Sequence, residues 1–265
     1  MKKIILFVAL VYSEIGYSQS NNVWNGKKCA VILTYDDAIQ QQLDNAVPVL
    51  DSLKLKASFY LTAFSQSMQD HLKDWKKLST KGYELGNHTL FHPCVGGKGR
   101  DWVKPEYDLN NYNVRRMVDE IRMTNVFLNQ LDGKTKRTFA FTCGDMKVHD
   151  TAFIDQLKDD FIAARAVRSQ MHTIDKVDLY NVDCYMVNSN TADQMIEWVK
   201  KAEETNSLLV ILFHGVGGGN SLNVAVPEHS KFLHYLKKNQ KDIWIPTMLE
   251  VAEYIKKYQE KNKMK

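Results

Sequence analysis

The chain has 265 residues, of which 44% are hydrophobic and 25% are charged. These proportions are typical of a globular protein and exclude a collagen-like or disordered chain. The formal net charge is only +4 and is spread along the chain, so we expect no nucleic-acid partner. One large domain fits this length, and α/β barrels often reach this size.

The N-terminus has the pattern of an export signal. Lys2 and Lys3 precede the apolar run 4–12, and small residues follow at Gly16 and Ser18. This order of basic, apolar and small residues is the signature of a secretory signal peptide. We therefore expect cleavage after residue 18, a single domain over residues 19–265, and a periplasmic or secreted protein. No later stretch approaches the roughly 18 consecutive apolar residues of a transmembrane segment.

Short apolar runs then alternate with longer amphipathic stretches. Runs dense in β-branched and aromatic residues predict strands. The expected strands cover residues 29–35, 57–62, 137–142, 161–167 and 208–213, with weaker ones at 83–86, 183–188 and 243–246. Apolar residues at the helical period predict a helix within residues 114–131, and Thr191 is a suitable cap for another. Strand and helix in repeated alternation predict an α/β fold, a (β/α) barrel or a related parallel sheet.

Polar residues directly follow several of these strands, where barrel enzymes carry their catalytic residues. These residues are Asp36 and Asp37, then Asn87, His88 and His92, then Cys143 to Asp145, and finally His214. If the barrel forms, they meet at one mouth.

The residue types at these strand ends suit metal-assisted hydrolysis. Two imidazoles and one carboxylate can hold a divalent metal and leave positions open for water and substrate. A zinc ion so held lowers the pKa of bound water from about 15.7 to about 7. A second carboxylate could take a proton from that water, and a further histidine could protonate a leaving group. Each group alone has a plainer interpretation, because paired aspartates are also common in turns and helix caps.

Three of the groups match motifs of one family. Residues 34–37 (TYDD) match T-F/Y-D-D, residues 88–92 (HTLFH) match H-S/T-x-x-H, and residues 212–214 (LFH) match L-x-H. From Cys29 to the last expected helix, the chain resembles the polysaccharide deacetylases of carbohydrate esterase family 4. The resemblance implies a distorted (β/α)7–8 barrel in a single domain. It also implies a metal-dependent hydrolase that removes acetyl groups from an acetylated oligo- or polysaccharide, at an N-acetylamino sugar or an O-acetyl ester.

The resemblance further implies a role for each matching residue. Asp36 would be the general base, His214 the general acid, Leu212 part of the acetyl-methyl pocket, and Asp37, His88 and His92 the metal ligands. The metal expected first is Zn2+, with Co2+, Ni2+ or Mn2+ as alternatives.

Two family motifs are altered in this chain. The third usually reads R-x-P-Y, but Ala140 stands in place of the arginine and Cys143 in place of the aromatic residue. We therefore expect no arginine to hold the base carboxylate, whereas the Cys143 N–H remains a candidate oxyanion donor. The fourth motif supplies an aspartate that orients the acid histidine. Asp183 is the nearest candidate, Asp178 competes with it, and both could be plain loop residues.

The insert after His92 is the expected substrate-binding segment. Trp102, Tyr107 and Tyr112 could stack on sugar rings, or they could simply hold the loop in place. Its polar residues Arg100, Asp101 and Asp108 could bind sugar hydroxyls. Cys94 and Cys143 both lie beside proposed active-site loops, where a disulfide and a pair of buried thiols are equally compatible with the sequence.

Two rival functions remain to be weighed. Non-haem iron oxygenases also use two histidines and one carboxylate, but they are all-β proteins with a short His-x-carboxylate pair, which this chain lacks. A pseudoenzyme that binds metal and sugar with little turnover is the alternative, because the third motif is altered. Asp36 and His214 argue against it, since a protein that only binds would not need them.

Overall fold

The computed structural model describes residues 22–263, and the expected signal peptide lies outside them. The strands of the main sheet are β1 (Cys29–Asp36), β2 (Ser58–Leu61), β3 (Glu84–Asn87), β4 (Thr138–Ala140), β7 (Ala163–Arg165), β8 (His172–Thr173), β9 (Tyr185–Met186), β10 (Ser207–Phe213) and β13 (Ile243–Trp244). Two small ladders join β5 (Lys147–Val148) to β6 (Thr151–Ala152), and β11 (Gly215–Val216) to β12 (Asn223–Val224).

The helices are α1 (Val47–Leu53), α2 (Gln66–Asp70), α3 (Leu72–Thr80), α4 (Val114–Asp132), α5 (Ala192–Thr205), α6 (Val226–Lys238) and α7 (Met248–Lys263). A π-helical turn (Gln42–Ala46) leads into α1, and short 3-10 turns lie at Pro105–Tyr107, Leu109–Asn111, Thr142–Gly144 and Phe153–Gln156. No described helix is both long and apolar enough to cross a membrane.

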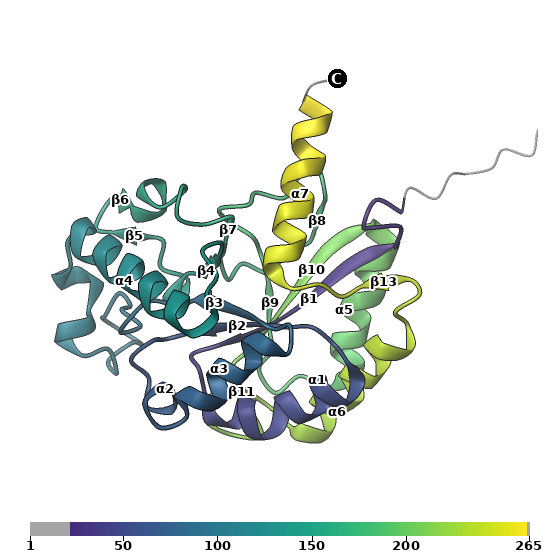
Figure 1. Ribbon diagram of the computed structural model, residues 1–265, viewed down its shortest axis with the longest axis horizontal. Coiled ribbons are helices and arrows are strands. Elements are labelled where there is room, and N and C mark those ends of the chain that lie inside the picture. Colours follow the sequence, from purple (N-terminus) through teal and green to yellow (C-terminus); the bar gives the residue numbers. More distant parts are fainter. Residues whose placement is uncertain (1–21, 264–265) are drawn as a thin grey trace, which may run out of the picture.

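The main sheet has the order β7-β4-β3-β2-β1-β10-β8, with β13 beside β1 and β9 beside β10. All of these pairs are parallel except β10 with β8. Figure 1 shows the sheet curled, with helices packed around it. Its edge strands β7 and β8 do not pair with each other within residues 22–263, so the barrel is incomplete. The expected distorted (β/α) barrel in a single domain is confirmed.

Each of the expected strand segments contains a strand, and both expected helices are present. At the start of α5, the Thr191 hydroxyl accepts from the Gln194 N–H, and the Gln194 side chain accepts from the Thr191 N–H. This reciprocal pair satisfies two of the free donors at the helix start. At the C-terminus of α4, Gly133 adopts a φ of 69°, the left-handed conformation that commonly ends helices.

Alternation along the strands separates two apolar layers. Outward side chains such as Leu33, Tyr35 and Phe213 pack against the layer formed by α1, α5 and α6. Inward side chains such as Ile32 and Tyr60 pack against α7. The α7 helix begins near the amino ends of β2 and β3, where its first amides donate to side chains of those strands. The α7 helix therefore closes the amino end of the interior, where the buried Ser58 and Glu84 side chains accept these bonds.

Gly86 occupies a crowded position in β3. A Cβ atom at Gly86 would lie 2.5 Å from Cδ1 of the buried Tyr60 ring, whose hydroxyl is held by Thr138 at 2.8 Å. We expect Gly86→Ala to lower the free energy of unfolding by about 1–3 kcal/mol, measured by urea denaturation. Because the clash is with the ring, Tyr60→Ala combined with Gly86→Ala should cost less than the sum of the single changes. Additive costs would show that another contact limits the position.

Candidate active site

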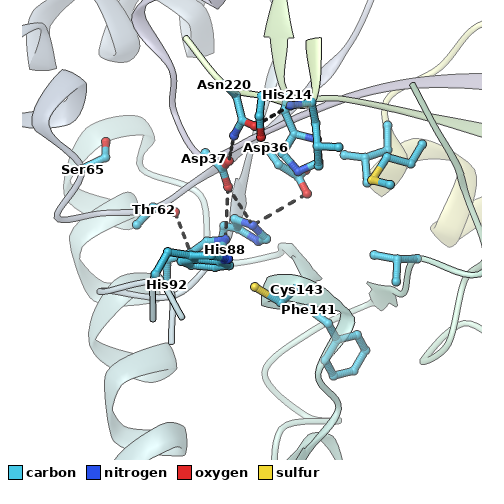
Figure 2. A pocket seen from close by; sticks show the side chains of 16 residues that line it. Asp36, Asp37, Thr62, Ser65, His88, His92, Phe141, Cys143, His214 and Asn220 are labelled. Carbon is cyan, nitrogen blue, oxygen red and sulfur yellow. Dashed lines mark hydrogen bonds and ion pairs between the residues drawn. The ribbon is translucent and has the colours of Figure 1, made fainter. Parts of the chain in front are cut away.

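A cavity of about 650 Å³ lies at the carboxyl ends of the inner strands. Of the residues proposed from the sequence, Asp36, Asp37, His88, His92, Trp102, Cys143, Leu212 and His214 line it. Figure 2 shows Asp36, Asp37, His88, His92 and His214 converging there, with Cys143 nearby. Tyr107 is not among the lining residues and instead stacks on Phe91, with ring centroids 5.3 Å apart.

Asp37, His88 and His92 form a compact group of donor atoms. Oδ1 of Asp37 lies 3.3 Å from Nε2 of His88 and 3.2 Å from Nε2 of His92. These separations match the edge of about 3.3 Å expected for a tetrahedron with metal bonds of about 2.0–2.1 Å. Oδ1 is also buried and has no hydrogen-bond partner within the described chain. The three side chains therefore fit a divalent cation.

The surroundings orient these side chains. Nδ1 of His88 lies 2.9 Å from the Ala140 carbonyl, so this nitrogen carries the proton and leaves the Nε2 lone pair facing Asp37. Asn220 donates to Oδ2 of Asp37 at 3.1 Å, which leaves Oδ1 free for a cation. Asp37 and His92 adopt φ values of 76° and 57°. Positive φ is uncommon for non-glycine residues, although Asp and His adopt it more often than most, and such conformations cluster at functional sites.

The charges of this group favour cation binding. Burial would raise the pKa of Asp37, but His88 and His92 beside it hold that pKa well below its ordinary value. Burial would lower the pKa of His92, but Asp37 raises it above its ordinary value. Asp37 is therefore a carboxylate over the whole neutral range, and protons compete with a cation for His92 when the pH falls.

A buried arginine holds Asp36. Arg165 is fully buried, and its Nη2 donates to Oδ2 of Asp36, which is 2% exposed. Burial alone would lower the pKa of Arg165, but Asp36 raises it, so the guanidinium stays charged. The prediction that no arginine holds this carboxylate was wrong. Residues 140 and 165 are partners in the β4–β7 ladder, so the guanidinium comes from the neighbouring strand instead of from position 140.

His214 follows β10, and within residues 22–263 neither Asp183 nor Asp178 is hydrogen-bonded to its ring. The Asp183 carboxylate accepts instead from Arg168 at 2.8 Å and from His172 at 2.7 Å. Asp183, the nearest of the candidates, therefore does not orient His214. Nδ1 of His214 is buried without a hydrogen-bond partner within residues 22–263. Burial lowers the pKa of His214, and Asp36 only partly offsets this effect.

Gln42 is a site residue that the sequence analysis missed. Its buried side-chain amide donates to the carbonyls of Asp36 at 2.6 Å and His214 at 2.9 Å. It thereby fixes the ends of β1 and β10 relative to each other. A glutamine at the start of a helix carries no signal of this role, since the contact is to His214, 172 positions away in the sequence.

Residues 25–159 match the family model of the polysaccharide deacetylases. The chain belongs to this family. The family implies a hydrolase that acts on an acetylated carbohydrate, and it is generally metal-dependent.

Three proteins similar to this family member share 24% sequence identity with it or less. The uncharacterised protein YlxY of Bacillus subtilis is 24% identical over 138 residues, which are 52% of this chain and only 36% of that relative. The Bc1960 peptidoglycan N-acetylglucosamine deacetylase is 20% identical, with 83% of this chain and 86% of that chain covered and a TM-score of 0.55. BA3943 of Bacillus anthracis, a CE4 family pseudoenzyme, is 14% identical, with coverage of 85% and 66% and a TM-score of 0.54. At these identities the solved structures show the fold alone.

In this family member the loop after β4 is tied to the insert after His92. Cys94 and Cys143 form a disulfide with Cα atoms 5.8 Å apart. Arg100 donates to Asp145 at 2.5 Å and to the Cys143 carbonyl at 3.1 Å. Asp108 accepts from the Gly96 N–H at 2.9 Å. Arg100 and Asp108, two of the residues considered for sugar hydroxyls, thus hold the loop.

The aromatic residues of the insert divide by exposure. Trp102 is 61% exposed and lines the cavity, so its ring face is available to a ligand. Tyr112 is 2% exposed and donates to Glu120 at 3.2 Å, so it stabilises the insert from inside. Tyr112 therefore holds the insert in place, whereas stacking of Trp102 on a sugar ring stays a prediction.

The Arg165–Asp36 pair predicts a large loss of stability when the arginine is removed. In Arg165→Met, Asp36 becomes a buried carboxylate without its guanidinium partner, which should cost about 3–5 kcal/mol of unfolding free energy at pH 7. Urea denaturation with chelator present measures this loss.

Two further variants make this test specific. Arg122→Met removes a half-exposed arginine that pairs with Asp160, and it should cost only about 0–1 kcal/mol. Ala140→Arg combined with Arg165→Ala places the guanidinium on the partner strand and should recover part of the lost stability. A loss for Arg165→Met no larger than that for Arg122→Met would contradict the assignment of Asp36 as the group left unpaired.

Proposed function

We propose that this protein is a metal-dependent carbohydrate deacetylase with Asp36 as general base and His214 as general acid. The observation that carries the proposal is the arrangement of Asp36, held by Arg165, beside the donor group of Asp37, His88 and His92. Oδ2 of Asp36 lies 3.7 Å from Nε2 of His88, so base and ligand group share one corner of the cavity. If the Arg165–Asp36 pair served only stability, it would not need to lie next to the donor group of Asp37, His88 and His92.

Asp37, His88 and His92 would hold the metal, with Zn2+ expected first and Co2+, Ni2+ or Mn2+ as alternatives. A divalent ion bound there would polarise the acetyl carbonyl and supply an activated water at neutral pH. The buried carbonyl contact at Nδ1 of His88 keeps this ring in the tautomer that the role requires.

The two oxygens of Asp36 have different surroundings, which suits a base. Oδ2 is bound by Arg165, whereas Oδ1 is buried and has no hydrogen-bond partner within the described chain. Arg165 therefore fixes the carboxylate while Oδ1 remains able to accept a proton from the attacking water. This division supports Asp36 as the base and Arg165 as its positioning residue.

His214 is placed to return a proton to the leaving group. Its ring lines the cavity, and its low pKa makes it a strong acid once it is protonated. The leaving group would be a sugar amine or a sugar hydroxyl, because both need a proton to depart. No covalent acyl-enzyme is required, since water attacks the acetyl carbon directly.

The cavity wall offers recognition for an acetyl group on a sugar. Leu212 is 1% exposed, and both Leu212 and Phe141 line the cavity with apolar surface that suits a methyl group. The backbone N–H of Cys143 is the proposed donor to the developing oxyanion. Trp102 offers an exposed ring for stacking on a sugar. These features support an acetylated oligo- or polysaccharide as substrate, with the acetyl group on nitrogen or on oxygen.

We also propose that the chain is exported after removal of residues 1–18. A disulfide between Cys94 and Cys143 is typical of proteins that work in an oxidising compartment, which supports the proposal. N-terminal sequencing of the protein secreted or released from the periplasm tests it, and a retained Met1 would contradict it.

Acetate release tests the proposed activity. Metal-loaded protein should release acetate from at least one member of a panel of chitin oligomers, peptidoglycan fragments and acetylated xylan. Asp36→Asn should lower this rate by at least about 100-fold, because general base catalysis contributes about 10²–10⁴-fold. The bound metal should remain, as measured by elemental analysis.

Asp44 provides the matched control for Asp36→Asn, because it is exposed on the π-helical turn Gln42–Ala46 that follows β1. Asp44→Asn should retain full activity. Full metal occupancy without acetate from any substrate would favour the alternative, a pseudoenzyme that binds metal and sugar. The pairing of Asp36 with Arg165 favours the enzyme.

The pKa of His214 predicts how activity depends on pH. Burial lowers this pKa below its ordinary value of 6.5, and a cation bound nearby would lower it further. Because the acid must be protonated to act, kcat/KM should fall as the pH rises through that lowered pKa. His214→Gln should remove this alkaline limb together with most of the rate, whereas the exposed His234→Gln should keep both. An alkaline limb that persists in His214→Gln would assign it to another group.

A further inference from the structure

His92 lies between two sets of metal-binding atoms. On one side its Nε2 lies 3.2 Å from Oδ1 of Asp37. On the other side its Nδ1 lies 3.5 Å from Sγ of Cys94, which is bonded to Sγ of Cys143. The donor atoms of His92, Cys94 and Cys143 all lie within 4.8 Å of one another, as do those of Asp37, His88 and His92. The imidazole is therefore common to both groups.

A neutral imidazole has only one free lone pair. When Nε2 binds a metal beside Asp37, Nδ1 carries the proton, and when Nδ1 binds a metal, the proton moves to Nε2. His92 can therefore serve one of the two groups at a time. This exclusion follows from the ring itself and requires no movement of the backbone.

The redox state of the cysteines decides whether the second group exists. Sulfurs in a disulfide carry no charge and are not thiolate ligands. A dithiol reductant that supplies two electrons and two protons breaks the S–S bond to give two thiols, and the reductant becomes a disulfide. Cys143 borders the cavity and is half-buried, so its sulfur is the one open to attack, while Cys94 is buried.

One edge of this group already has the length found in a thiolate zinc site, and the two sulfurs separate when the disulfide is reduced. Bonds of about 2.3 Å to sulfur and about 2.0–2.1 Å to nitrogen require an N···S edge of about 3.5 Å. The separation of His92 Nδ1 and Cys94 Sγ is already 3.5 Å. Thiolates are softer ligands than a carboxylate and favour zinc and Cu(I), so two of them compete strongly with Asp37 and His88.

We propose that reduction of the Cys94–Cys143 disulfide creates a second metal site, formed by Nδ1 of His92 and the two thiolates, that is mutually exclusive with the Asp37, His88 and His92 site. Metal binding displaces the two thiol protons. In the oxidised protein, His92 is a ligand of the first site. In the reduced protein, His92 becomes a ligand of the second site, and the first site loses it. The second site itself depends on no deacetylase activity, but its exclusion of the first rests on the metal site of the proposed function.

Cobalt titration tests the proposal, because Co2+ bound by thiolate shows an intense sulfur-to-metal charge-transfer band in the near ultraviolet. The mature protein is titrated with Co2+ before and after reduction by a phosphine, which takes up oxygen from water as the two thiols form. We expect one Co2+ per chain in each form and the charge-transfer band only in the reduced form. Acetate release at one equivalent of metal should fall at least tenfold on reduction.

Two variants separate the sites. Asp37→Ala should lose Co2+ in the oxidised form, yet bind it with the charge-transfer band after reduction. Cys94→Ser combined with Cys143→Ser should bind Co2+ without the band under either condition, while the free thiols of Cys29 and Cys184 remain as an internal control. Circular dichroism before and after reduction monitors the fold.

Several outcomes would overturn the proposal. These are a reduced protein without the band, two Co2+ bound per chain at once, a band that survives in the double serine variant, and loss of the fold on reduction. Failure of the proposed function is distinguishable, because it would appear as absent acetate release with the cobalt results unchanged. If the oxidised protein bound no Co2+, the first site and the exclusion would both fall.

Discussion

The buried ion pair between Arg165 and Asp36 is the contact on which the geometry of the site depends. Each charge taken alone into the interior would cost several kcal/mol, so each requires the other. Asp36 ends the central strand β1, whereas Arg165 ends the edge strand β7, four strand spacings away. In a flat sheet that interval would be about 19 Å at about 4.8 Å per strand. The pair can form only if the sheet curls, and the curl brings the strand ends to one cavity.

The same constraint explains why Ala140 does not remove the base-holding arginine from this protein. Positions 140 and 165 are paired in the ladder, so both side chains stand on the inner face of adjacent strands. A small residue at 140 leaves room for the longer side chain from position 165 to reach Asp36. The guanidinium thus reaches the carboxylate from a different backbone position, and its contact with Oδ2 leaves Oδ1 unoccupied.

Much of this arrangement follows from local sequence patterns. Dense apolar runs identify the strands, and the rule that barrel chemistry follows strands identifies Asp36, His88 and His214 as neighbours. Arg165 could have been found by the same reasoning, because a charged residue inside the apolar run 161–167 requires a buried partner. The identity of the carboxylate that Arg165 contacts could not have been predicted, because it depends on how far the sheet curls.

Other features depend on contacts between distant segments and have no local signature. The partners of Asp183 are Arg168 and His172, which approach it only through the fold of the loops after β7. Sequence could not choose between a disulfide and free thiols for Cys94 and Cys143, because Cα separation decides it and loop positions set that separation. Two-residue strands such as β8 are too short for any periodicity to appear. Sequence patterns therefore predict which face of a strand is buried, but they do not predict which loops contact each other.

The placement of the ion pair bears on whether the protein is an enzyme or only a binder. Buried ion pairs contribute little to stability compared with well-packed apolar residues, and replacing them by such residues is often neutral or stabilising. A protein that needed only to hold metal and sugar would gain nothing from a charged pair beside the ligand group. Chemistry explains the pair better, because a fixed carboxylate with one free oxygen is what proton transfer from water requires. Under the proposed function, the altered third motif therefore moves the arginine that holds Asp36 to another strand and does not remove it.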